Sequence, residues 1–218
     1  MTPKTEQELS ELVAGAKGPL RIQGGGTRPI GISQGELVSS TGLSGIELYE
    51  PGALTVVVKA GTPLAELEAA LAAENQRLPF EPMDHRGLLG SKGAPTIGGV
   101  ISANVSGPRR IQVGAARDFM LGVRFVDGTG AIIKNGGRVM KNVMGYDLVK
   151  LMTGSYGTLG VITEVSLKVL PKSDSAGCVV VHGLEDSDAI KALAAALGSP
   201  YDVSGAAHIP QAKDRDAI

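Results

Sequence analysis

Apolar residues recur at helical spacing in some stretches of the chain and alternate with polar residues in others, which predicts a mixed α and β protein. Thr5 and Glu8 have the spacing of a capping box, a pattern that marks the first turn of a helix. Leu9 and Val13 follow at helical spacing, and Gly18 ends the pattern. The chain is therefore expected to open with a helix.

Three short β-like runs follow this helix and are separated by glycine and serine residues, over 20–23, 36–39 and 46–49. Runs of this kind are typical of short strands. Together with the opening helix, they indicate a small α/β unit that covers about residues 1–53.

A second unit begins with a valine-rich strand over 54–60. Thr62 is expected to cap the helix that follows, and Pro63 to occupy its first turn, where the missing N–H costs nothing. Three leucines at helical spacing mark the buried face of this helix: Leu64, Leu67 and Leu71.

The second unit continues through a hairpin and a long strand. Apolar and polar residues alternate over 120–134, and an Asp-Gly pair that starts at Asp127 interrupts them with a strong turn signal. Another alternating run, over 160–170, predicts one more strand. The unit is expected to cover about 54–171, and the fold class is α+β.

The last part of the chain changes in character and predicts the start of a third unit. A strand is expected over 178–181, followed by a helix that Ser187 caps and whose inward face includes Ile190 and Leu197. A segment of about 45 residues is usually too small to fold alone. The range 172–218 is therefore expected to be the truncated start of an α/β substrate or cap domain, completed by further chain or by a partner.

The composition is that of a soluble globular protein, since 43% of the residues are hydrophobic and 20% are charged. A net charge of −1 gives no basic surface for a nucleic acid. Three phenylalanines, four tyrosines and no tryptophan also leave few rings to stack on bases. Nucleic-acid binding is therefore not expected.

The single cysteine, Cys178, excludes an internal disulfide and cannot supply the roughly four ligands of an iron–sulfur cluster. The stretch 1–20 lacks the basic segment and apolar core of a signal peptide, and no apolar run approaches the ~20 residues of a membrane span. A cytoplasmic protein is expected, with no direct membrane insertion and any membrane contact made through a partner.

The most informative chemistry lies in Gly24, Gly25 and Gly26, which follow the first predicted strand. Each glycine costs roughly 0.5 to 1 kcal/mol relative to alanine, so such a run indicates that something approaches the backbone closely. Bare N–H groups at this position form a nest for an anion, and Arg28 adds positive charge. A phosphate or pyrophosphate is the expected ligand, and an ordinary surface turn is the alternative.

Other common site patterns are excluded or weak. The dinucleotide fingerprint G-x-G-x-x-G fails because Pro29 stands at the third glycine position, and no P-loop pattern occurs. The G-x-S-x-G pattern that begins at Gly31 lacks the strand and helix of a hydrolase elbow. His182 and His208 have no metal-ligand spacing, so no metal site is expected.

Several motifs occur in a fixed order along the chain. They cover 22–27, 95–100 with Asn104, Arg117 with Asp118, 141–148 and 154–163. In this order they resemble the FAD-binding domain of the vanillyl-alcohol oxidase and p-cresol methylhydroxylase (PCMH) flavoprotein superfamily, and an ordered set is more specific than one motif. Two segments, 106–110 and 137–146, are similar to the FAD-binding subunits of bacterial glycolate oxidases.

This resemblance implies a PCMH-type FAD-binding domain of two α/β subdomains, about 1–53 and 54–171, with FAD held between them. The Gly24 loop and the segment 96–104 would surround the pyrophosphate and the inner flavin, and 157–162 would lie near the adenine half. No catalytic residue is assigned. The cofactor-binding residues expected on this basis are Gln23, Gly24, Gly25, Gly26, Thr27, Arg28, Pro82, Asp84, Thr96, Gly98, Gly99, Asn104, Gly157 and Ile162.

The residues around Thr96 fit this placement. Thr96 is expected to cap a helix that begins near Ile97, whose N-terminal N–H groups would form a second anion site opposite the first. Gly98 and Gly99 weaken the first turn of a helix, which the close approach of a flat ring would explain. Close packing of the helix is the alternative.

Two departures from the superfamily pattern change what is expected. Thr27 stands where relatives with covalent FAD often carry histidine, so the FAD is expected to be non-covalent. Pro82 to His85 departs from the Pro-x-Asp-Pro of relatives, which leaves the role of Asp84 open. His85 is either a proton donor near the flavin or a solvent-exposed loop residue.

The same resemblance implies a flavoprotein subunit of a glycolate oxidase complex, an FAD-dependent oxidoreductase that converts a small 2-hydroxy acid to a 2-oxo acid. Because the chain lacks iron–sulfur ligands, electrons would pass to partners, a homologous flavoprotein subunit and an iron–sulfur subunit. One alternative is a non-catalytic FAD-binding or scaffold subunit of such a complex. Another is an NADPH-dependent cell-wall precursor reductase of the same fold, which the match over 141–146 disfavours.

Overall fold

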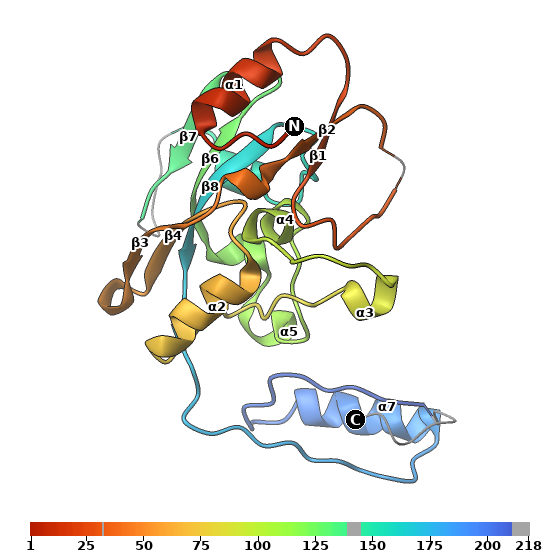
Figure 1. The fold of residues 1–218 in the computed structure, drawn as a ribbon. Coiled ribbons are helices and arrows are strands. Elements are labelled where there is room, and N and C mark those ends of the chain that lie inside the picture. Colours follow the sequence, from red (N-terminus) through yellow and green to blue (C-terminus); the bar gives the residue numbers. More distant parts are fainter. Residues whose placement is uncertain (32, 139–144, 211–218) are drawn as a thin grey trace.

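The computed structural model of the chain describes residues 1–31, 33–138 and 145–210. Its centre is a five-stranded sheet in the order β3-β4-β8-β6-β7, in which all neighbouring strands are antiparallel (Figure 1). The strands are β3 (Ile46–Glu50), β4 (Thr55–Lys59), β6 (Met120–Val126), β7 (Ile132–Gly136) and β8 (Val161–Lys168). The expected mixture of helices and strands is confirmed.

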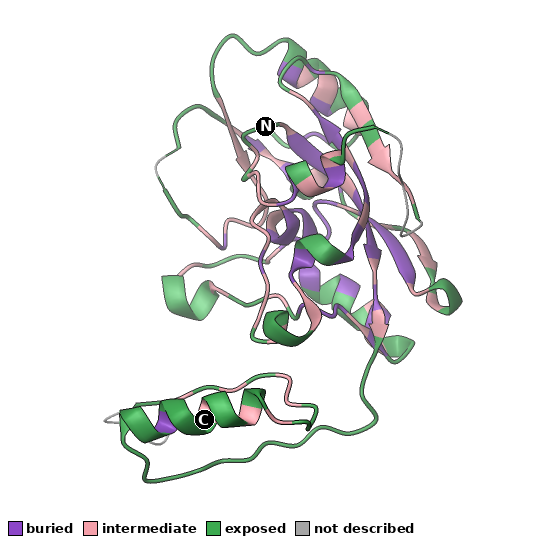
Figure 2. Ribbon diagram, turned by 180° about the vertical axis from the view of Figure 1, so that it is seen from behind, coloured by how far each residue is buried: buried purple, intermediate pink, exposed green. Residues whose placement is uncertain are grey.

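Three helices pack on this sheet and bury the larger apolar core with it. They are α2 (Leu64–Ala73), α4 (Ile97–Ser102) and α6 (Leu148–Met152). Figure 2 shows the buried residues concentrated along the sheet and α4. The leucines expected to face inward from α2 are all buried, namely Leu64, Leu67 and Leu71.

Helix α1 (Glu6–Ala14) contacts β6 and closes a second, smaller core. Leu9 packs there with Val126 of β6 and Val161 of β8. Strand β8 is consequently buried on both faces, and even the polar Thr163 is buried. The alternating pattern predicted this strand, but it did not predict that a helix would cover its second face.

Strands β1 (Leu20–Gln23) and β2 (Glu36–Ser39) form a separate parallel pair. Both lie within the predicted unit 1–53, whereas β3 of the same range joins the larger sheet by pairing with β4. Sheet membership therefore does not change at residue 53. The division into subdomains 1–53 and 54–171 stays a prediction.

The connections between these elements contain further short helices and strands. The antiparallel pair β5 (Gln76–Arg77) and β9 (Leu170–Pro171), the helices α3 (Arg86–Leu89) and α5 (Arg110–Val113), and 3₁₀ turns at Ser40–Gly42, Pro51–Ala53 and Ala116–Phe119 complete the body. Helix α3 is the most relevant of them, because it lies in the segment that leads toward α4.

The start of α1 confirms half of the predicted capping box. Thr5 Oγ1 accepts a hydrogen bond from the Glu8 N–H at 3.1 Å. The Glu8 carboxylate accepts its bond from the Lys4 N–H at 2.8 Å, one residue before the expected donor. One side-chain cap therefore starts this helix, and a second bond fixes the residue before it.

The predicted N-cap at Thr62 is wrong. Pro63 occupies the N-cap of α2, and Thr62 is fully buried. The Thr62 hydroxyl donates to the Lys59 oxygen at 2.7 Å and accepts from the Gly45 N–H at 2.9 Å. These bonds connect the end of β4 to the residue before β3. Because the Thr62 hydroxyl is engaged in them, it does not cap α2.

The hairpin expected around Asp127 is confirmed as β6 and β7. Asp127 Oδ1 accepts hydrogen bonds from the Thr129 N–H at 2.8 Å and the Ala131 N–H at 3.0 Å. The Thr129 hydroxyl also donates to Asp127 Oδ1, at 2.7 Å. This side-chain bond, followed by the backbone bonds, lowers the pKa of the Asp127 carboxyl because it favours the charged form. The aspartate therefore stabilises the turn through its side chain.

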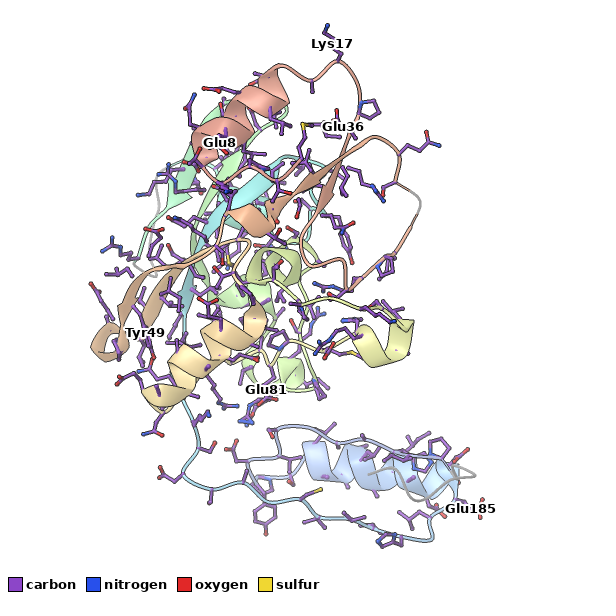
Figure 3. All side chains as sticks on the ribbon, viewed as in Figure 1. Glu8, Lys17, Glu36, Tyr49, Glu81 and Glu185 are labelled. Carbon is purple, nitrogen blue, oxygen red and sulfur yellow. The ribbon has the colours of Figure 1, made fainter. Side chains whose placement is uncertain are left out.

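The expected strand at 178–181 is wrong, since this range has no regular secondary structure and pairs with no described strand. Helix α7 (Asp186–Leu197) begins one residue before Ser187, with Glu185 at its N-cap. Figure 3 places Glu185 at the opposite end of the molecule from Glu8 of α1. Residues 211–218 of the predicted third unit lie outside the described residues.

The prediction that Ile190 and Leu197 face inward from α7 is also wrong. Ala189 is its buried residue, while Ile190 is 63% exposed, and the helix is mostly exposed in Figure 2. The C-terminal segment after β9 contacts the rest of the chain where Gln112 of α5 donates a hydrogen bond to Asp202. Helical periodicity of apolar residues is present, but none of the described elements packs against most of that face.

Candidate functional site

One cavity brings together three segments that lie far apart in the sequence: the loop after β1, the first turns of α4, and the turn before β8. Among the expected cofactor-binding residues, this cavity is lined by Gln23, Gly24, Gly25, Gly26, Thr27, Arg28, Thr96, Gly98, Gly99, Gly157 and Ile162. Four further lining residues were not named individually but lie in the expected segments 96–104 and 157–162, namely Ser102, Ala103, Gly160 and Val161. The lining residues outside the expected site residues and segments are Ile22, Ser40 and Tyr156.

The Gly24 loop lines this cavity with residues 24–28. Within the described chain, the amides of residues 24–28 donate to no protein acceptor. Gly26 has a φ of +68°, a conformation that glycine adopts without strain. Consecutive unpaired amides in such a turn favour an anion, as the sequence predicted.

Gly25 is required by protein packing as well as by any ligand. A Cβ built on Gly25 would lie 1.6 Å from the backbone oxygen of Ala94. The sequence predicted that something approaches this glycine closely, and in the structure it is the chain before α4. An alanine at this position would therefore have to displace the loop or the chain before α4.

Arg28 crosses from this loop to α4. Its Nη2 donates a hydrogen bond to the Gly99 oxygen at 2.6 Å, and its Nη1 is buried with no acceptor in the described parts of the chain. Burial lowers the pKa of Arg28, and the nearby Tyr156 hydroxyl opposes that shift. An anion next to Nη1 would satisfy this buried donor.

The N-terminus of α4 does not provide the second anion site that the sequence suggested. Thr96 does cap the helix, since its Oγ1 accepts from the Gly99 N–H at 3.3 Å. The Ile97 N–H, however, donates to the backbone oxygen of Thr62 at 3.0 Å, and the Gly98 N–H donates to the backbone oxygen of Ala60 at 2.8 Å. These amides already have protein partners, so they are not available to a ligand.

The two glycines of α4 have different roles. A Cβ on Gly98 would lie 2.6 Å from the Ala60 Cβ, so this glycine permits packing against the residue that follows β4. A Cβ on Gly99 would lie 3.6 Å from Arg28 Nη2, on the side of the cavity. The packing alternative therefore holds for Gly98, whereas at Gly99 the Arg28 side chain lies at an ordinary contact distance that does not require a glycine.

The turn before β8 adds an aromatic side chain to the cavity. Tyr156 is 58% exposed and has a φ of +54°, and its N–H donates to the Ser102 oxygen at 2.8 Å. Such a conformation is strained for a non-glycine residue and is often found at functional sites. The sequence contained the signal, because Tyr156 lies within the motif 154–163, from which only Gly157 and Ile162 were selected.

Three of the expected residues do not line this cavity: Pro82, Asp84 and Asn104. Asp84 is exposed and forms an ion pair with Arg86 at 2.7 Å, which lowers the pKa of its carboxyl to about 2 through hydrogen bonds from Arg86. Asn104 Oδ1 accepts from the Arg117 N–H at 3.0 Å. The side chains of Asp84 and Asn104 therefore bond to other residues of the protein, outside this cavity.

The structure bears on three further sequence-based expectations: the motif 141–148, His85, and the absence of a metal site or membrane span. Residues 141–144, half of the motif 141–148, lie outside the described residues. His85 is in a segment that does not line the cavity, and its Nδ1 lies 3.1 Å from the Met83 oxygen. Over the ranges that are described, no three metal-ligating side chains come together, and no helix is long and apolar enough to cross a membrane.

Comparison with known protein families matches residues 1–136 to the FAD binding domain. The chain belongs to this family. FAD is therefore its cofactor, as the ordered motifs predicted, and the fold is that of a PCMH-type flavoprotein domain. The unpaired amides of 24–28 and the buried Nη1 of Arg28 fit a pyrophosphate, the part of FAD that carries negative charge.

Curated relatives point to oxidoreductases of hydroxy acids. The chain is 45% identical over 161 residues to glycolate oxidase subunit GlcE of Escherichia coli (strain K12), which covers 72% of this chain and 43% of that protein. It is 36% identical over 159 residues to D-lactate dehydrogenase of Anaerostipes hadrus, covering 72% and 32%.

A third relative is glycolate oxidase subunit GlcD of Bacillus subtilis (strain 168), with 39% identity over 122 residues, 56% of this chain and 24% of that protein. The chain spans less than half the length of each of these relatives. The chain is an FAD-binding member of an oxidoreductase family.

Proposed function

We propose that this chain is the FAD-binding flavoprotein subunit of a complex that oxidises glycolate or another small 2-hydroxy acid to the 2-oxo acid. The observation that carries the proposal is the cavity in which the free amides of 24–28 meet the buried, unpaired Nη1 of Arg28. The names of the relatives support the substrate class, since they include glycolate oxidase subunits and a D-lactate dehydrogenase.

The reaction removes two electrons and two protons from the hydroxy acid, and bound FAD supplies the acceptor for the electrons. The part of this chain is to bind and orient the cofactor. The Gly24 loop would hold the pyrophosphate through its N–H groups, and Arg28 would neutralise charge there. We assign no proton acceptor, because none of the described histidines lines the cavity.

The electrons would leave through a partner. The chain has one cysteine, which is exposed, so an iron–sulfur relay would have to lie in another subunit. A homologous flavoprotein subunit is the second expected partner. The runner-up proposal is a non-catalytic FAD-binding subunit of the same complex, with the hydroxy acid oxidised on that homologous partner.

Anaerobic reduction of the flavin distinguishes these proposals. The purified chain with FAD, and the chain with its partner subunits, are each mixed with glycolate or D-lactate, and loss of the yellow absorbance is followed. Bleaching of the FAD on this chain supports the catalytic subunit, and bleaching that requires the homologous partner's own flavin supports the runner-up. Bleaching by NADPH but by neither acid would contradict both.

The attachment of FAD is tested separately. Thr27 lines the cavity where a histidine would permit a covalent bond, and Cys178 belongs to the C-terminal segment. We therefore expect acid precipitation of the holoprotein to release all the flavin into the supernatant. Flavin fluorescence that remains on the denatured polypeptide in a gel would contradict non-covalent binding.

A further inference from the structure

The Gly24 loop is contacted by the segment 84–94, which we call the α3 strap because it contains α3, and no residue of this segment lines the cavity. Ser91 Oγ on the strap donates a hydrogen bond to the backbone oxygen of Thr27 at 2.7 Å, and this bond is partly buried. Ser91 does not line the cavity, whereas Thr27 does. The strap therefore contacts the loop without facing the cavity.

Backbone packing reinforces this contact at a second position. Gly93 on the strap has a φ of +117°, and a Cβ built on it would lie 2.4 Å from the Gly25 oxygen. The Ala94 oxygen in turn leaves no space for a Cβ on Gly25. Two glycines thus allow the two backbones to meet, and Ser91 adds a side-chain hydrogen bond between them.

Hydrogen bonds also form between residues within the strap. The Ser91 N–H donates to the Arg86 oxygen at 3.2 Å, and Arg86 Nη1 donates to the Gly93 oxygen at 3.3 Å. Arg86 forms an ion pair with Asp84 as well. These bonds give Ser91 a defined position from which to reach Thr27.

The direction of the Thr27 carbonyl has a consequence for the cavity. The peptide between Thr27 and Arg28 is trans, so its C=O and its N–H point in opposite directions. With the oxygen held toward the strap by Ser91, the Arg28 N–H is turned away from the strap. That N–H has no acceptor in the described chain, and Arg28 lines the cavity.

We propose that Ser91 is a positioning residue for FAD: through its bond to the Thr27 oxygen, it keeps the Arg28 N–H turned into the cavity for an anionic group of the cofactor. Ser91 itself does not touch the cofactor in this proposal. The inference rests on the FAD site described above and not on the identity of the hydroxy acid.

The affinity for FAD, measured by fluorescence titration of apoprotein, tests the proposal. Ser91→Ala removes one hydrogen bond and is expected to weaken FAD binding about fivefold. Ser91→Thr keeps a hydroxyl group and is expected to bind FAD within about twofold of the wild type. Thermal melts of each apoprotein report any loss of stability.

Ser10→Ala is the matched control. Ser10 Oγ also donates to a backbone oxygen, that of Gly130 at 2.6 Å, and that bond is also partly buried but lies away from the cavity. It should lower apoprotein stability about as much as Ser91→Ala and leave FAD affinity unchanged. Unchanged affinity in Ser91→Ala, or an equal loss in Ser10→Ala, would overturn the proposal.

This readout separates the inference from the proposed function. If the wild-type chain and Ser91→Ala differ in FAD affinity as expected but glycolate reduces neither, only the proposed substrate fails. If glycolate reduces the flavin in the complex and the two FAD affinities are equal, only the role of Ser91 fails.

Discussion

The Arg28 side chain joins the Gly24 loop to α4 through its bond to the Gly99 oxygen, and a buried donor nitrogen remains on it for an anion. Arg28→Met keeps most of the side-chain volume but removes the charge and both donors. Hydrogen bonds to charged groups contribute roughly 1.5 to 3 kcal/mol, so FAD affinity should fall about ten- to hundredfold. Arg21→Met in β1 is the control and should leave the FAD dissociation constant within about twofold. Equal constants for the two variants would remove Arg28 from the site.

Gly25 tests the same loop through packing. Because a Cβ would collide with the Ala94 oxygen, Gly25→Ala should already displace the loop, at a cost of about 1 to 3 kcal/mol. We therefore expect Gly25→Ala and Gly25→Asp both to lose most FAD affinity in the titration. Gly52→Ala, where a Cβ meets no atom within 4 Å, is the control. Wild-type FAD affinity in Gly25→Ala would contradict the close approach of the two backbones.

At the scale of the elements, Glu6 attaches α1 to the sheet. Its carboxylate accepts hydrogen bonds from Arg124 of β6 and from Thr163 Oγ1 of β8, the latter at 2.6 Å. Partial burial by itself would raise the pKa of Glu6, but these hydrogen bonds and the charge of Arg124 outweigh it, and the net pKa is lowered. A carboxylate of this kind stabilises the fold when it is ionised.

Glu6→Gln should accordingly destabilise the apoprotein by about 1 to 2 kcal/mol at neutral pH, measured by urea unfolding. Since the folded pKa lies below the unfolded value of about 4.3, the advantage of the wild type is complete above that pH. It should disappear as the pH falls through the lower, folded pKa. Glu11→Gln, on an exposed part of α1, should change little. A difference between wild type and Glu6→Gln that does not depend on pH would contradict an ionic role for Glu6.

At the scale of the whole molecule, the C-terminal segment is bonded to the body much less than the sheet strands are bonded to one another. Helix α7 buries Ala189, while apolar side chains on either side of it, such as Val179 and Tyr201, are largely exposed. In the full chain, amides of 173–210 should exchange with deuterium roughly a hundredfold or more faster than those of β8. Addition of a partner that covers the segment should slow that exchange. Uniform protection in the lone chain would show that 172–210 is an integral part of the FAD-binding body.

The sequence by itself determined the elements whose signals are local. The runs at 20–23 and 36–39 became β1 and β2 with those bounds, and the leucine spacing of α2 identified its buried face. The ordered motifs also indicated the family and FAD, because several motifs in a fixed order are more specific than any one of them. Where a helix or strand depends on neighbours within a few residues, its pattern is readable in the chain.

Only the tertiary structure decided which of these residues meet. It placed the Ala94 oxygen against Gly25 and left Asp84 outside the cavity. It also paired the first N–H groups of α4 with the backbone oxygens of Thr62 and Ala60. It also left α7 without the core that its periodicity suggested. The physical reason is common to these cases: backbone donors and apolar faces are satisfied by segments distant in sequence, and a local pattern does not state which distant segment will arrive.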